Sequence, residues 1–395
     1  MRLPILTALL LAAALPLGAE PWDDTVAAAR GQTVYWNAWG GDERTNDFIA
    51  WASDQVEAQY GVTIQQVKLT DTAEAVARVI AEKAAGQDEA GTVDMIWING
   101  GNFLSMKEQG LLHGPFVTDL PNSRYLDLSP GSAASVDFTV PVEGYESPWR
   151  LAKFVLIHDS ARVDQPPMSM AELLNWSKAN PGRFTHPAVS NFMGSTFLKQ
   201  ALIELTPDVA ALQEPATDAN FDAVTAPLWA WYDELRPTLW RGGETFPENA
   251  SVQEQMLNDG VVDISMAFDP ASAAAAIEKG LLPETARAYG LRGGTIGNIS
   301  FVAIPYNAAH KEGAMVVANF LLEPATQAHA QDIGVLGSFS VLDPARLGEA
   351  ERAAFYALPT SPALPTLEEL GPTLIEPHPS WMTMIADAWA KRYTQ

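Results

Sequence analysis

The apolar residues in the first third of the chain switch between the spacing of buried strands and that of amphipathic helices. Residues 33–39 are β-branched and aromatic, which favours a strand, and this run ends at Gly40-Gly41. From Arg44 to Tyr60, apolar residues recur at the spacing of one helix face, and Gly61 follows where a helix commonly ends. The same reasoning predicts strands at 62–69 and 93–98 and helices at 72–86 and 103–109.

Strands and helices that alternate in this way predict right-handed βαβ units in an open, mostly parallel sheet. The second half repeats the pattern, with strands predicted at 153–158, 183–187, 262–267 and 295–305 and helices at 169–179, 195–205, 221–235, 252–258, 310–331 and 381–393. A chain of 395 residues is also too long for one typical core. We therefore expect an α/β protein of two lobes, each a mostly parallel sheet flanked by helices, with a ligand cleft between the lobes.

The predicted lobe boundaries follow from where strands leave and return. Residues 20–150 form the first part of lobe 1, 151–294 form lobe 2, and 295–335 return to lobe 1, whereas the Pro-rich segment and final helix within 336–395 are assigned to neither lobe. Two or more crossings would act as paired hinges, so that the lobes close on a ligand. The alternative is two domains that pack rigidly.

The first 19 residues have the features of a secretory signal peptide. Arg2 supplies a positive charge, residues 3–17 form an apolar stretch, and small residues precede a cleavage point after Ala19. The apolar stretch is shorter than the roughly 20 residues that span a bilayer, which disfavours the alternative of a membrane anchor. We therefore expect a periplasmic protein, secreted and cleaved after Ala19.

Charge and composition narrow the range of partners. The net charge is −24, and removal of the signal peptide makes it −25. An acidic surface repels a phosphate backbone, so nucleic acid is not expected as a partner. The chain has no Cys, which excludes disulfides, thiolate metal sites and lipid attachment at a Cys.

The sequence contains no recognisable catalytic motif. A G-x-S-x-G elbow and a P-loop are both absent, and no two of the six His are three or four residues apart, as a helical zinc motif requires. The glycine-rich run 293–297 precedes a predicted strand, whereas a dinucleotide-binding loop follows one. We therefore expect no enzymatic activity, no cofactor and no metal. The alternative is a secreted α/β hydrolase or transferase whose active site the sequence does not reveal.

Aromatic and polar residues gather at the predicted strand ends, where ligands bind in sheets of this type. Aromatic faces supply apolar contact and hold cations, while Asn, Ser and Asp side chains orient a ligand. Neighbours in a strand point opposite ways, so one of Trp36 and Asn37 is expected in the core. Residues 191–195 precede a predicted helix and either bind an anion through backbone N–H groups or simply cap the helix. The candidate ligand-binding residues are Trp36, Asn37, Trp39, Asp42, Asn99, Asn102, Ser147, Trp149, Asn191, Ser195, Phe268 and Asp269.

Several segments resemble a known family. The sequences GQTVYWNAWGGD at 31–42, VDMIWING at 93–100 and ESPW at 146–149 are similar to the YnjB-type substrate-binding proteins of ABC transporters, as are 364–372 and 376–381 near the C-terminus. Residues 299–305 and the segment NFLLEP at 319–324 resemble the wider family 1 of extracellular solute-binding proteins. The resemblance spans essentially the whole chain after the signal peptide.

This resemblance implies a type 2 periplasmic-binding fold and a monomer that captures a small-molecule solute by lobe closure. It also implies delivery of the solute to the permease and ATPase of an ABC importer, and kinship with receptors for thiamine, iron and polyamines. Iron-binding relatives use two neighbouring Tyr, and no adjacent pair exists here, which disfavours ferric iron. A cationic or aromatic solute such as thiamine would suit the Trp, Phe and Asp side chains. A sensory receptor that signals through a membrane partner is a further alternative.

Overall fold

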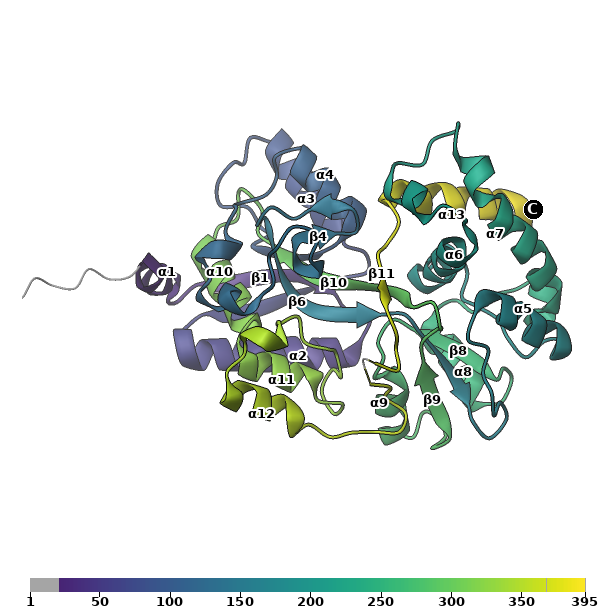
Figure 1. The fold of residues 1–395 in the computed structure, drawn as a ribbon. Helices are drawn as coiled ribbons and strands as arrows, with labels where there is room; N and C mark the ends of the chain where they lie inside the picture. The colour runs from purple at the N-terminus through teal and green to yellow at the C-terminus, as the bar shows by residue number, and fades with distance from the viewer. Residues whose placement is uncertain (1–20, 367, 395) are drawn as a thin grey trace, which may run out of the picture.

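Two sheets, each flanked by helices, form two lobes that extended strands connect (Figure 1). The computed structural model describes residues 21–366 and 368–394. The predicted signal peptide, residues 1–19, therefore lies outside the described residues. Within the described ranges, no helix is long and apolar enough to cross a membrane.

The sheet of lobe 1 follows the order β2-β1-β3-β10-β6, and β11 pairs with the start of β10. Strand β1 is parallel to β2 and to β3, as the βαβ pattern predicts, whereas β10 is antiparallel to β3 and β6. The strands are β1 (Thr33–Trp39), β2 (Thr63–Leu69), β3 (Met95–Ile98), β6 (Glu146–Lys153), β10 (Thr295–Ala303) and β11 (Thr373–Leu374), with a small hairpin of β4 (Val136–Asp137) and β5 (Val140–Pro141) beside them.

Helix α2 shows how the local sequence specifies its element. The Asp42 carboxylate accepts hydrogen bonds from the backbone N–H groups of Arg44 and Thr45, at 3.3 and 3.2 Å, and so caps the first turn. Phe48 and the other apolar residues at helical spacing are buried against the sheet, and Gly61 ends the helix with a φ of 67°. The helices of lobe 1 are α1 (Pro21–Ala29), α2 (Glu43–Tyr60), α3 (Ala73–Ala84), α4 (Gly100–Glu108), α10 (Lys311–Leu321), α11 (Pro324–Gln331) and α12 (Glu349–Tyr356).

The sheet of lobe 2 has β7 at its centre, antiparallel to both β8 and β9. The chain enters lobe 2 from β6 into β7 and returns from β9 toward β10. The two strands on either side of β7 therefore run in the opposite direction to β7. The expected parallel pairing thus describes β1, β2 and β3 of lobe 1, whereas β7 of lobe 2 pairs antiparallel with β8 and β9. The elements are β7 (Val155–Asp159), β8 (Ile264–Ala267), β9 (Ala286–Tyr289), α5 (Met170–Ala179), α6 (Phe192–Leu205), α7 (Phe221–Leu235), α8 (Ala250–Asn258), α9 (Ser272–Glu278) and α13 (Pro379–Tyr393).

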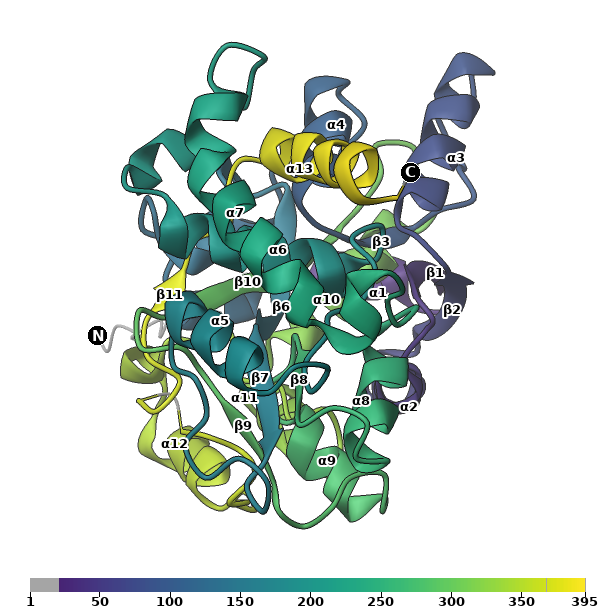
Figure 2. The same ribbon diagram turned by 90° about the vertical axis from the view of Figure 1, so that its right-hand side faces the viewer.

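The C-terminal segment, whose lobe the sequence left open, contacts both lobes. Phe355 of α12 packs against the core of lobe 1. The chain then passes the hinge, where Lys153 donates hydrogen bonds to the carbonyl oxygens of Gly371 and Pro372 and to the Thr373 hydroxyl. Helix α13 buries Trp381 and two further apolar residues in the core of lobe 2, beside α6 and α7 (Figure 2). The exact residue boundaries of the lobes stay a prediction.

Two local expectations differ from the structure. The helix predicted at 103–109 starts earlier, at Gly100, whose φ is 57°, and forms α4. Residues 183–187, predicted as a strand, pair only through a bridge between Phe184 and Ile264. In that segment the carbonyl oxygens of Arg183 and Phe184 instead accept hydrogen bonds from the loops around Asp263 and Trp240.

Candidate functional site at the interface of the lobes

Three helices of the two lobes begin where the lobes meet. Helices α2 and α4 of lobe 1 start after Asp42 and Asn99, and α6 of lobe 2 starts after Asn191. The ring of Phe138, which follows β4, connects α4 with α6. A Cβ atom at Gly100 would lie 2.6 Å from this ring, and the ring centroid is 5.4 Å from the Lys199 ammonium. Phe138 therefore joins the start of α4, at the carboxyl end of β3, to α6 of lobe 2.

One end of this interface, which we call the acidic end, contains three buried carboxyl groups and one buried ammonium. Asp137, Glu146, Glu376 and Lys199 are each at most 2 % exposed. The Lys199 ammonium donates a 2.6 Å hydrogen bond to Glu376, and Asn298 of β10 contacts the other oxygen of Glu376 at 3.4 Å. Charged groups buried this deeply need partners, because moving a charge out of water is costly. Lys199 can neutralise only one of the three carboxyl groups.

Aromatic rings from both lobes enclose the Lys199 ammonium. It lies 5.4 Å from the ring centroid of Phe138 in lobe 1 and 5.8 Å from that of Phe192 in lobe 2, which is within the range of cation–π attraction. Phe192 in turn meets Phe268 edge to face, with the centroids 5.1 Å apart. Phe192 is 44 % exposed, so the aromatic wall continues to the surface.

Phe138 has an unusual backbone for a bulky residue. Its φ is 55°, in the left-handed region that favours glycine, at the turn between β4 and β5. A non-glycine residue in this region costs of order 1–3 kcal/mol, and such strain occurs often at ligand-binding sites. The turn places the preceding Asp137 against α4, where its carboxylate accepts hydrogen bonds from the Gly100 N–H at 2.5 Å and from the Asn99 amide at 3.2 Å.

Burial changes the protonation of two carboxyl groups at the acidic end. It raises the pKa of Asp137 to about 7, although the hydrogen bonds from Gly100 and Asn99 favour ionisation. Burial, with the neighbouring Asp137 carboxyl as the second cause, holds the pKa of Glu146 well above its ordinary value. Neither Glu146 oxygen has a hydrogen-bond partner among the described residues. The acidic end therefore contains carboxyl groups that hold protons near neutral pH.

At the other end, which we call the arginine end, two guanidinium groups of lobe 1 meet one carboxylate of lobe 2. Asp269, which follows β8, contacts Arg150 of β6 at 2.8 Å and Arg44 of α2 at 3.6 Å through the same oxygen. Its other oxygen accepts a hydrogen bond from the Ala271 N–H just before α9. Arg150 also donates to the Thr45 hydroxyl at 3.2 Å. These contacts hold the two lobes together in this structure.

Four of the predicted site residues lie inside lobe 1. Trp36 and Trp149 are 0 and 1 % exposed and pack edge to face with centroids 5.5 Å apart, so they belong to its core. Asn37 is buried within the sheet, where its amide donates to the Tyr35 carbonyl, and the buried Ser147 hydroxyl has no partner among the described residues. These side chains form no exposed wall and lie outside the proposed site.

The other predicted residues lie at or near the interface. Asp42, Asn99 and Asn191 precede helices, and Asp42 and Asn191 cap them through their side chains. Asn102 is half-buried in the first turn of α4. The Ser195 hydroxyl donates to the Phe192 carbonyl, and Trp39 is 43 % exposed at the end of β1. Phe268 and Asp269 contact Phe192 and Arg150, as described above.

Sequence reasoning missed eight residues that the structure places at the interface: Arg44, Asp137, Phe138, Glu146, Arg150, Phe192, Lys199 and Glu376. Two of these residues could have been identified from the sequence. Arg150 stands between Trp149 and Leu151 in the largely buried strand β6, and Lys199 lies among buried residues of α6. A single long charged side chain in a buried element usually has a specific partner. Phe138 has no such signal, because its conformation and its partner depend on the folded chain.

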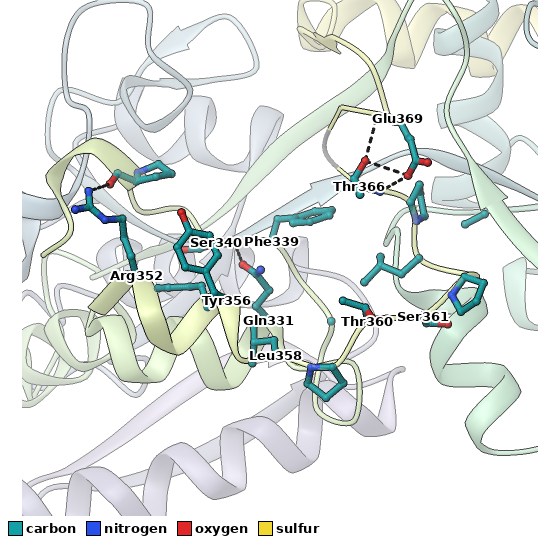
Figure 3. A pocket seen from close by; sticks show the side chains of 18 of the residues that line it. Gln331, Phe339, Ser340, Arg352, Tyr356, Leu358, Thr360, Ser361, Thr366 and Glu369 are labelled. Carbon is teal, nitrogen blue, oxygen red and sulfur yellow. Dashed lines mark hydrogen bonds between the residues drawn. The ribbon is translucent and has the colours of Figure 1, made fainter. Parts of the chain in front are cut away.

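A separate cavity of about 1060 Å³ lies beneath the C-terminal segment, and residues of both lobes, such as Tyr289 and Gln331, line it (Figure 3). Figure 3 shows Phe339, Arg352 and Tyr356 among its lining residues. Phe339 pairs with Leu151 at the edge of β6, whereas β10, β3 and β1 follow on the other side of β6. None of the twelve predicted residues lines this cavity. We therefore place the candidate site at the acidic and arginine ends of the interface and not in this cavity.

Crossing strands connect the two lobes, and polar, aromatic and charged side chains line the interface between them. This arrangement is that of a two-lobed binding protein. Residues 51–352 match the family model of the bacterial extracellular solute-binding proteins. The protein YnjB from Escherichia coli (strain K12) is 42 % identical over 375 residues, which cover 95 % of this chain and 94 % of YnjB. The chain belongs to this family of solute-binding proteins, and it resembles the YnjB branch as the sequence motifs predicted.

Solved structures confirm the fold. The spermidine/putrescine ABC transporter substrate-binding protein PotD from Streptococcus pneumoniae has a TM-score of 0.60 at 15 % identity, with 91 % of this chain and 99 % of that chain covered. The periplasmic binding protein AfuA from Actinobacillus pleuropneumoniae, solved with fructose-6-phosphate, has a TM-score of 0.62 at 13 % identity, with 92 % and 99 % covered. These likenesses show the fold, and the family match makes the chain a non-enzymatic extracellular solute-binding protein, so the hydrolase alternative is not supported.

Proposed function

We propose that the protein captures a small organic cation in the periplasm and delivers it to the permease of an ABC importer. The observation that supports the cation is the charge at the acidic end. One of the three buried carboxyl groups, Glu376, is paired with the buried Lys199 ammonium, and the other two have no cation in hydrogen-bond contact among the described residues, so the site can accept a further positive charge. We infer that Asp137 pairs with the solute cation when the lobes close.

The aromatic rings support the same choice of solute. Phe138 and Phe192 already hold one ammonium, that of Lys199, and their quadrupoles would attract a second cation or stack on an aromatic ring. Thiamine combines a positive charge with aromatic rings. Polyamines also merit a test, because PotD, which shares this fold, carries spermidine and putrescine in its name.

Family membership supports the remaining parts of the proposal. A solute-binding protein of an ABC transporter needs a permease and an ATPase as partners. We propose that the mature protein is a monomer, released into the periplasm by cleavage after Ala19. The predicted residues Trp39, Asp42, Asn99, Asn102, Asn191, Ser195, Phe268 and Asp269 line or support the proposed site from both lobes.

A thermal-shift screen followed by calorimetry tests the solute class. The panel contains the cations thiamine, choline, putrescine and spermidine, the neutral sugars glucose and maltose, and the anions phosphate and sulfate. A ligand that binds only the folded protein stabilises it by about 2.7 kcal/mol at a hundredfold excess over Kd. We expect at least one cation to raise the melting temperature. Hits confined to sugars or anions would contradict the proposal.

The variant Phe138→Gly removes the ring and relieves the left-handed backbone, so it should fold well. We expect it to weaken cation binding at least tenfold without lowering the melting temperature of the unliganded protein. Tyr356→Ala is the matched control, because Tyr356 is an aromatic residue that is 83 % exposed on α12, away from the interface. Equal affinity in the two variants would mean that the aromatic wall does not contact the solute.

A further inference from the structure

The acidic end holds more carboxyl groups than it can keep ionised in the unliganded protein. The Glu376 carboxylate is paired with Lys199 at 2.6 Å, and the nearest carboxyl groups, Asp137 and Glu146, have no cation in hydrogen-bond contact among the described residues. Two buried carboxylates without cations repel each other and lose hydration, so a proton takes the place of a cation. A solute cation and a proton are therefore competitors for the same group.

The two unpaired carboxyl groups differ in what surrounds them. Asp137 accepts hydrogen bonds from Gly100 and Asn99 of α4, which stabilise its ionised form, and Glu376 is the charged group that faces it from the C-terminal segment. Glu146 on β6 receives no hydrogen bond, and the Asp137 carboxyl faces it. Lys107 of α4 attracts Glu146 from a distance but forms its own ion pair with Glu143, at 2.8 Å. Asp137 is thus the group of the two that ionises first.

We propose that cation capture is an exchange reaction, in which Asp137 releases one proton as the solute cation binds and Glu146 keeps its proton. This inference rests on the proposed function, because it requires a cationic solute. The balance is simple: one cationic group of the solute pairs with Asp137 in the buried site, and one proton leaves the Asp137 carboxyl for solvent. Capture therefore becomes stronger as the pH rises toward neutral and levels off above the pKa of Asp137, which is about 7.

Calorimetry in buffers of different ionisation enthalpy counts the protons released on binding. Choline and putrescine serve as probes, because neither changes its own charge between about pH 5.5 and 8. We expect nearly one proton released per cation at about pH 6 and a much smaller number at about pH 8. The Kd should fall about tenfold per pH unit below pH 7 and then become constant. A binding heat that is independent of the buffer at pH 6, or a Kd that is constant over this range, would overturn the exchange.

Two amide variants locate the proton. Asp137→Asn keeps an oxygen that can accept from the Gly100 N–H but has no proton to exchange, so we expect no proton release and weaker binding. Glu146→Gln mimics the neutral acid, so we expect proton release to persist. If proton release is lost in Glu146→Gln but persists in Asp137→Asn, the assignment of the proton to Asp137 is wrong.

Failure of the exchange and failure of the proposed function give different results. If none of thiamine, choline, putrescine and spermidine raises the melting temperature or produces heat at any pH, the cationic solute itself is wrong. If a cation binds without proton release, the proposed function stands and only the exchange is wrong. If Asp137→Asn does not fold, the buffer series on the unaltered protein still decides.

Discussion

The contact between Asp269 and the two arginines should set how readily the lobes close. Asp269 lies in lobe 2, and Arg150 and Arg44 lie in lobe 1, with the Asp269 and Arg150 side chains 9 and 10 % exposed. The substitution Asp269→Asn keeps the shape and the oxygen that accepts from the Ala271 N–H, but it removes the charge. Because the contact joins the lobes, we expect the loss to affect the closed form more than the open one.

The size of the effect follows from the geometry. Two unit charges about 4 Å apart at an effective dielectric constant of about 20 attract each other by about 4 kcal/mol. The Asn side chain retains a neutral hydrogen bond, and charged hydrogen bonds contribute about 1.5–3 kcal/mol net. We therefore expect Asp269→Asn to disfavour closure by about 2 kcal/mol, which corresponds to roughly a 30-fold weaker affinity for a solute held in the closed form.

Small-angle scattering and calorimetry measure the two consequences separately. Without solute, Asp269→Asn should have a larger radius of gyration than the unaltered protein, and its solute affinity should fall. Asp263→Asn is the matched control, since the Asp263 carboxylate pairs with Arg183 and Arg162 within lobe 2. The control should lower the melting temperature but leave the radius of gyration unchanged. If both variants change closure equally, or Asp269→Asn changes neither quantity, the contact does not control closure.

Three further predictions concern stability. Trp149→Ala should cost about 3–5 kcal/mol in urea unfolding, because Trp149 is 1 % exposed in the core of lobe 1, and a cost below about 1 kcal/mol would contradict that role. Lys199→Met should cost about 3–5 kcal/mol by leaving Glu376 buried without its partner, whereas the double variant with Glu376→Met should recover most of that loss. Burial lowers the pKa of His186 to about 4, against about 6.5 in the unfolded chain. Between these values the unfolded chain binds more protons, so stability is complete above about pH 6.5 and falls by up to about 3 kcal/mol as the pH drops to 4. The decline should be shallower in His186→Gln, and equal declines in the two proteins would refute this contribution.

Local sequence predicted the elements of lobe 1 well, because each depends on contacts close along the chain. The predicted strand 33–39 is β1, and the predicted helix from Arg44 ends at Gly61 as α2 does. The strand pairing within lobe 2 was harder to predict from the sequence, because the direction of β7 relative to β8 and β9 depends on how the chain crosses between the lobes. Short elements such as α9 and α12 were not predicted, because neither has a long periodic pattern.

The sequence by itself determined the class of this protein. Its βαβ pattern, its length and its family motifs specify two α/β lobes of the solute-binding type, since periodicity and composition record which faces are buried. Only the tertiary structure decided which side chains meet between the lobes. Trp36 and Trp149 look like ligand-binding residues in the sequence but lie in the core, because alternation along a strand does not say which face is covered. Asp137, Lys199 and Glu376 are far apart in the chain, and the crossing strands and the C-terminal segment bring them to one buried place. Their meeting creates the excess of carboxyl groups on which the proposed function rests.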